Sequence, residues 1–493
     1  MTIPFKQIPA NVRVPLFYAE VSNSQANTGG VTQRALLIGQ ITSAGAATAN
    51  VPLRCQGPTD AIAQGGVGSM LALMAAAYLA NDSFGEVWYL PLSDAAGATT
   101  ATGSVAITAS PTAAGTLSLY IAGQLVSLAV TAAETAAQCA TALAAAINAN
   151  TNLPVTATAA TGTVTLSAVN KGLAGNDIDI RLNYQGAAGG EVTPAGMTVT
   201  ITAMTGGATN PTLTAALAAL VDMPFDFIAC PYTDTASLNA LQAFLADNGG
   251  RWSWNTQVYG HVFTAARGTS GTLTTLGTGR NDQHASIMGC YDSPSPVWVW
   301  AAALTGAAAA SLKSDPALPL QTVPINGVLA PPLPSRFLLA QRNTLLWDGI
   351  STFTVDAGGQ VHIENLITTY QQNAFGQADS SYLQVETMFT LMYVLRAMSG
   401  MVTSKYAQVK LAADGTRFAP GSAIVTPGMI KADIIAKYQE LEFNGYVQNS
   451  AAFARAVIVQ KNAANPNRVD VLWPGTLING LRIFALLAQF RLS

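Results

Sequence analysis

The side chains best suited to acid–base or nucleophilic chemistry are few and widely separated. The chain has three histidines, His261, His284 and His362. His261 falls in a predicted strand and His284 just before one, so we interpret them as sheet-edge or loop residues rather than catalytic bases. No Gly-x-Ser-x-Gly motif presents a serine nucleophile. An α/β hydrolase therefore ranks third among the three functions that we consider.

Other candidate sites are equally weak. Asp177 and Asp179 would share one face of a strand, as a cation or glycosidase site requires, but the alternation around them is more typical of a solvated strand. The run Gly65–Gly68 lies inside a helical segment and matches no phosphate-binding motif, so a helix break or close packing explains it better. The sequence predicts no catalytic residue, cofactor or metal site.

The cysteines indicate neither a zinc site nor a disulfide framework. Cys55, Cys139, Cys230 and Cys290 are far apart and have no histidine at ligand spacing. We expect reduced, partly buried thiols.

Charge is sparse and unevenly distributed. Charged residues make up 10% of the chain and the net charge is −3, which gives no reason to expect nucleic-acid binding. From Leu383 onward, however, eleven basic residues face six acidic ones. Chance and solvated faces explain this excess at least as well as a binding surface.

Hydrophobic stretches are too short for a membrane span. The most apolar stretches, Met70–Ala80 and Val297–Ala310, fall below the roughly 18 to 20 residues that a membrane-spanning helix needs. The first ten residues lack a signal-peptide core. We expect buried helices, no membrane insertion and no secretion.

The elements that would position any site alternate between strands and helices. Continuous apolar strands at 34–39, 87–92, 225–230, 257–264 and 285–290 predict a mostly parallel sheet with helices on both faces. We assign a central α/β domain to residues 25–93 and 205–315. The predicted fold class is a multidomain mixture of α/β and α+β structure.

Residues 94–204 interrupt this alternation and predict an inserted β-rich domain. The Ala122-Gly123 pair predicts a two-residue hairpin turn. Thr131 and Glu134 have capping-box spacing before an alanine-rich helix.

Beyond a Pro-rich linker at 316–334, residues 335–480 predict an α+β core. Its long helices are expected at about 380–399 and 429–442, the second opened by Thr426-Pro427.

Both ends of the chain resemble extended arms, at 1–24 and 481–493. A terminal strand can add to the sheet edge of another copy, where the main chain supplies affinity. Completing its own domain is the alternative for the C-terminal strand. The arm residues that we expect to face partners are Val12, Val14, Leu16, Tyr18, Leu481, Ile483, Phe484, Leu487 and Phe490.

Four blocks resemble the tail sheath proteins of Mu-like contractile phages. They are IPANVRVPLFYAEVSNSQAN, STFTVDAGGQVHIENLITTYQQNAFGQADSSYLQVET, TSKYAQVKLAADGTRFAPGSAIVTPGMIKADIIAKYQELEFNGYVQN and NPNRVDVLWPGTLINGLRIFALLAQFRL. Residues 131–182 are similar to the insertion that these sheaths often carry.

The resemblance implies a virion structural protein, assembled in the host cytoplasm, that needs no cofactor. Hexameric rings would stack into a helical sheath around a tail tube, linked by exchanged terminal strands, with baseplate and tail terminator proteins as further partners. Contraction would drive the tube through the host envelope. The C-terminal region would lie innermost, so Lys405, Lys410, Lys431 and Lys437 are candidates to face the tube.

A surface-binding protein is the alternative from another class. Its inserted β-rich domain would bind carbohydrate or a cation.

Overall fold

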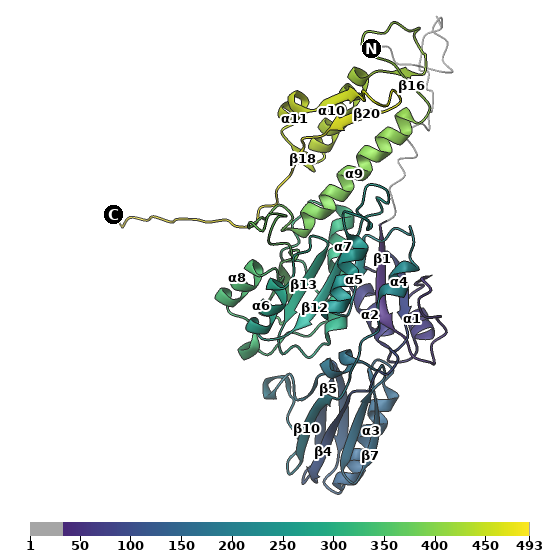
Figure 1. Ribbon diagram of the computed structural model, residues 1–493. Coiled ribbons are helices and arrows are strands. Elements are labelled where there is room, and N and C mark those ends of the chain that lie inside the picture. The colour runs from purple at the N-terminus through teal and green to yellow at the C-terminus, as the bar shows by residue number, and fades with distance from the viewer. Residues whose placement is uncertain (1–32, 493) are drawn as a thin grey trace, which may run out of the picture.

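A computed structural model describes residues 33–492, and its largest sheet has six strands (Figure 1). The strand order is β13-β12-β11-β1-β3-β2, and only β2 runs antiparallel to its neighbour. This confirms the prediction of a mixed α/β fold. The strands are β1 (Arg34–Gln40), β2 (Leu53–Arg54), β3 (Glu86–Leu92), β11 (Phe227–Ala229), β12 (His261–Arg267) and β13 (Ala285–Cys290).

Helices cover both faces of this sheet, as its continuous apolar strands require. Ala265 and Met288 belong to the main hydrophobic cluster, which includes residues of α2 (Met70–Leu79) and α7 (Val297–Ser314). Their neighbours Ala266 and Ile287 point the other way, into a cluster with residues of three further helices. These are α5 (Thr235–Leu245), α6 (Ser270–Thr278) and α8 (Leu339–Trp347).

The predicted helical segment that contains the glycine run Gly65–Gly68 is two helices. The first, α1 (Pro58–Gly65), ends at the glycine run, and α2 begins after Ser69, whose side chain accepts a hydrogen bond from the Ala72 amide. Gly66 has φ 90°, and a Cβ there would collide with the Thr42 hydroxyl. Close packing and a helix break therefore explain the glycines.

Two sheets and one helix follow β3 in the chain and occupy the lower part of Figure 1. The four-stranded sheet has the order β10-β4-β8-β7 and the three-stranded sheet the order β6-β5-β9. The strands are β4 (Thr102–Ala109), β5 (Gly115–Ile121), β6 (Gln124–Val130), β7 (Val155–Ala160), β8 (Thr163–Ala168), β9 (Ile180–Leu182) and β10 (Thr198–Thr205).

The predicted hairpin turn is confirmed, but the predicted helix cap is wrong. Ala122 and Gly123 both have positive φ and connect β5 to β6. The helix α3 (Ala136–Ala149) has its capping box at Thr135 and Gln138, one turn after Thr131. Glu134 instead accepts a hydrogen bond from the Thr131 amide, within the preceding turn.

The Pro-rich segment 316–334 packs against the α/β region. Leu320 and Ile325 are fully buried, and the amides of Thr322 and Ile325 donate to carbonyls of β15 (Val361–Asn365). The partner of β15 is β14 (Thr352–Val355), which also contributes to the main cluster through Phe353.

The helix α9 (Val385–Tyr406) connects the two larger hydrophobic clusters. Phe389 and Met392 lie in the main cluster, whereas Val394 and Met401 lie in a separate C-terminal cluster. Arg396 forms an ion pair with buried Asp226, with Nη2 2.5 Å from Oδ1. The N-terminal part of α9 thus belongs to the main cluster and its C-terminal part to the other. Its 22 residues span about 33 Å.

The C-terminal cluster is enclosed by α9, α10 (Pro427–Phe443), α11 (Ser450–Ala456) and short strand pairs. Thr426 caps α10 as predicted, since its side chain accepts a hydrogen bond from the Met429 amide. The pairs are β16 (Lys410–Leu411) with β17 (Ile424–Val425), β18 (Val447–Gln448) with β21 (Thr476–Leu477), and β19 (Ile458–Lys461) with β20 (Val469–Leu472).

Candidate functional site: an assembly surface

The one serine–histidine contact that resembles catalytic machinery in residues 33–492 is sealed inside the sheet. His261 Nε2 lies 2.9 Å from Ser286 Oγ, but both residues are fully buried. Among the residues that the structure describes, His261 Nδ1 has no hydrogen-bond partner, so no acid of this region orients the ring. Burial, with a smaller effect from His284, lowers the His261 pKa well below its ordinary value. The sheet-edge interpretation of His261 is wrong, because β12 lies between β13 and β11.

The interpretation of Asp177 and Asp179 as a solvated strand is also wrong. Asp177 ends a 3-10 helix (Leu173–Asp177) and pairs with Arg267 of β12. Asp179 lies 2.5 Å from Arg181, which reaches Asp292 at 3.0 Å. These ion pairs connect the inserted residues to the main sheet. Among the residues placed by the structure, no group of three metal-binding side chains is found.

The cysteines are unpaired thiols. Cys55, Cys139, Cys230 and Cys290 are all free, and the last three are buried. Burial raises the pKa of the Cys230 and Cys290 thiols to about 12. Such thiols are unreactive at neutral pH.

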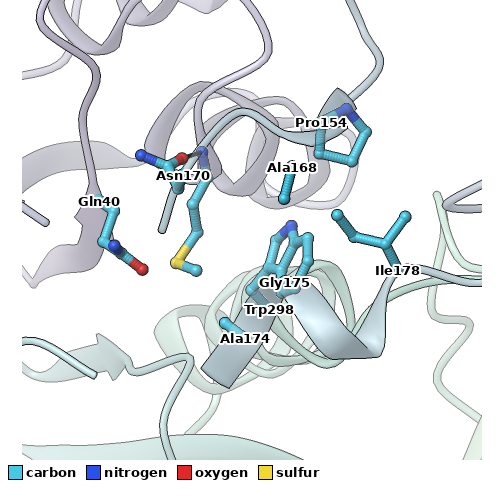
Figure 2. A pocket seen from close by; sticks show the side chains of 9 residues that line it. Gln40, Pro154, Ala168, Asn170, Ala174, Gly175, Ile178 and Trp298 are labelled. Carbon is cyan, nitrogen blue, oxygen red and sulfur yellow. Dashed lines mark hydrogen bonds between the residues drawn. The ribbon is translucent and has the colours of Figure 1, made fainter. Parts of the chain in front are cut away.

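A small cavity lies at the junction between the inserted sheets and the main sheet (Figure 2). Gln40, Asn170 and Trp298 are among its lining residues, and its volume is about 10 Å³. This space accommodates about one water molecule and excludes a substrate.

The C-terminal arm exposes a run of large apolar side chains to solvent. Between Gly480 and Leu492 the chain belongs to no strand, and it leaves the body as an extended segment (Figure 1). Its apolar side chains face solvent, with exposed fractions from 69% at Leu481 to 90% at Leu492. They include the predicted arm residues Ile483, Phe484, Leu487 and Phe490. A contiguous apolar surface of this kind marks an interaction site.

The C-terminal cluster also carries an open sheet edge beside an apolar groove. The β19–β20 hairpin pairs only within itself, so each strand has one unpaired edge among the described residues. Beside β20 runs an apolar groove of about 640 Å³. It is lined by Leu391, Val394, Leu395, Met398 and Val402 of α9, by Ile430 and Ile434 of α10, and by Val469, Val471 and Trp473 around β20, with further residues of β16 and β17.

This groove was not predicted from the sequence. The alternation of Val469, Val471 and Trp473 was a usable signal, because alternate strand residues share one face. The N-terminal arm residues Val12, Val14, Leu16 and Tyr18 lie outside the described residues.

Two of the four candidate lysines form ion pairs with neighbouring acids. Lys405 pairs with Asp433 at 2.9 Å and Lys437 with Glu440 at 2.7 Å. Across residues 33–492, no acidic group lies within ion-pair distance of Lys410 or Lys431. Lys431 and Lys437 are six positions apart on α10 and so point about 120° apart.

No helix in the described part of the chain is both long and apolar enough to span a bilayer.

Two solved structures show distant similarity to this chain. The sheath tail protein Lin1278 from Listeria innocua is 13% identical, with a TM-score of 0.47 over 92% of this chain and 94% of that one. A chain of the anti-feeding prophage baseplate, symmetrised six-fold, is 11% identical, with a TM-score of 0.48 over 100% of both chains.

Sequence comparison is decisive. Residues 206–369 match the model for the phage tail sheath protein central domain, and residues 377–491 match that for the phage tail sheath C-terminal domain. The Mu-like prophage FluMu tail sheath protein of Haemophilus influenzae strain Rd is 42% identical over 99% of this chain and 100% of its own length. The chain therefore belongs to the phage tail sheath protein family.

Proposed function

We propose that this sheath protein polymerises by strand exchange, each copy placing its C-terminal arm against the β20 edge and apolar groove of another copy. The supporting observation is that residues 33–492 include both an arm whose apolar side chains are exposed and an open sheet edge beside an apolar groove. Added strands gain main-chain hydrogen bonds from such an edge.

The arm and the groove are complementary in chemistry. Alternate residues of an extended arm fall on opposite sides, so Ile483 and Leu487 share one side and Phe484 and Phe490 the other. Either side would place apolar side chains over α9. Burying one large apolar side chain stabilises an interface by about 1.5–3 kcal/mol.

In the assembled particle, hexameric rings would stack into a helical sheath around the tail tube, bounded by baseplate and tail terminator proteins. The arms would keep neighbours connected while subunits rotate into a shorter, wider lattice. Interface gained in that transition would drive the tube through the host envelope, with no catalytic step. Assembly would take place in the host cytoplasm.

Disulfide cross-linking between differently labelled copies tests this exchange. One population carries Val471→Cys on β20 and the other a single cysteine between 483 and 490, both in a Cys55→Ser background. In mixed assemblies we expect cross-linking that alternates along the arm, because alternate side chains face the groove.

A cysteine replacing Leu333 of the Pro-rich segment is the control, since Leu333 is more exposed than Val471, at 76% against 44%, and does not line the groove. Cross-linking at Leu333 equal to that at Val471, or none at either, would contradict the proposed acceptor.

A further inference from the structure

The first residues of the arm contact the body of the subunit. The last backbone hydrogen bond before the arm runs from the Ile478 amide to the Tyr446 carbonyl. Residues 480–482 then cross to the Pro-rich segment at the base of α9. There the Gln321 side chain donates to the Leu481 carbonyl at 3.1 Å.

Arg482 turns back into the body while its neighbours face solvent. Its side chain is 18% exposed, whereas Leu481 and Ile483 are 69% and 83% exposed. Its Nη2 lies 2.5 Å from Oε2 of Glu386, which is 6% exposed. Within residues 33–492, neither Glu386 Oε2 nor Arg482 Nη1 makes a hydrogen bond of good geometry. The contact between the two side chains is therefore an ion pair through Nη2.

Glu386 is held in place from its other oxygen. Oε1 accepts a hydrogen bond of 2.7 Å from the amide of fully buried Leu320. Its position in the first turn of α9 also favours a negative charge. A buried carboxylate held in this way strongly favours a cationic partner, because an unpaired buried charge is costly.

Gly480 lies in close contact with Pro319 of the Pro-rich segment. A Cβ at this position would lie 2.7 Å from Pro319 Cγ, so any other residue would force the chain and the proline apart.

We propose that Glu386 is a positioning residue that fastens the arm at Arg482 and presets the direction in which residues 483–492 leave the subunit. The ten residues beyond the ion pair can span about 33 Å when extended. Holding the first residue of the arm in place reduces the conformational entropy that residues 483–492 lose when they bind a neighbouring copy. This inference rests on the proposed strand exchange and adds the element that aims the arm.

Trypsin provides a direct test on the full-length monomer, because the arm contains two cleavage sites, Arg482 and Arg491. Cleavage after Arg482 requires its side chain to leave Glu386, whereas Arg491 is exposed. We expect the dilute wild-type chain to be cut after Arg491 about tenfold or more faster than after Arg482, measured by mass spectrometry.

Glu386→Gln retains a side-chain acceptor for the Leu320 amide but removes the charge, so it should make the two rates similar. Arg482→Lys offers a second variant that trypsin still recognises and should give intermediate protection, because lysine lacks the planar fork. Arg491→Lys is its matched control for the preference of trypsin. The melting temperature of each variant reports whether it folds.

Equal rates at Arg482 and Arg491 in the wild-type chain, or unchanged protection in folded Glu386→Gln, would overturn the proposal. Sheath formation by a chain lacking residues 483–493 would instead overturn the strand exchange and leave the protection result standing. The two failures are therefore distinguishable.

Discussion

Phe484→Ser should separate assembly from folding. Phe484 is 80% exposed in the single chain, so the substitution removes little that stabilises the fold. In a strand-exchanged sheath the ring would be buried, and its loss should cost about 2 kcal/mol per contact. This corresponds to an association about 30-fold weaker.

The assay is the protein concentration at which particles first pellet, measured beside the melting temperature of the dilute chain. We expect the pelleting threshold to rise about 30-fold while the melting temperature stays within about 1 °C. Phe84→Ser is the matched control, because Phe84 is fully exposed on the loop before β3. Assembly of Phe484→Ser at the wild-type threshold would refute a buried position for this side chain.

Arg396→Met should lower the free energy of unfolding by about 3–5 kcal/mol in denaturant titrations, because it leaves Asp226 buried without its partner; replacing exposed Arg491 with Met should have no effect. Acidification should destabilise the chain through His261, whose folded-state pKa is depressed. The contribution of neutral His261 to the free energy of unfolding is fully present above the ordinary pKa of 6.5. Below that pH the unfolded chain binds a proton that the folded chain does not, so the free energy of unfolding falls by about 1.4 kcal/mol per pH unit. His261→Phe should flatten that slope in pH-dependent denaturation, and His362, whose pKa is raised by the Thr322 carbonyl and Asp356, should not contribute to it. Reversing Lys410 and Lys431 to Glu should weaken tube-templated assembly more at low salt than at high salt, and pelleting with tube that is unchanged at every salt concentration would show that these lysines do not face it.

Local sequence patterns were sufficient to predict the strands, turns and helix caps that neighbouring residues determine. The continuous apolar runs at β1, β12 and β13, the Ala122-Gly123 turn and the Thr426 cap all follow from residues next to one another. The exposed apolar arm was also visible, because alternation leaves it apolar on both sides.

Long-range partners were not predictable in the same way. Asp177 has the sequence surroundings of a solvated carboxylate, but its partner Arg267 is 90 positions away. Glu386 and Arg482 are likewise brought together only by the crossing of residues 480–482. A single sequence gives the type of each charge and not which charge it meets.

Competition between equivalent local signals explains the remaining errors. Thr131 and Thr135 both precede a residue that suits a capping box, and the structure uses the second. The glycine run 65–68 could have continued a packed helix, but the positive φ of Gly66 and Gly68 ends it.

Electron microscopy of a chain truncated after Arg482 tests strand exchange most directly. The truncation keeps the Glu386 ion pair and removes the side chains proposed to bind the groove of another copy. Strand exchange predicts a folded monomer with the wild-type melting temperature that forms no striated cylinders under conditions where the full-length chain does. Cylinders formed by the truncated chain at the wild-type concentration would contradict it.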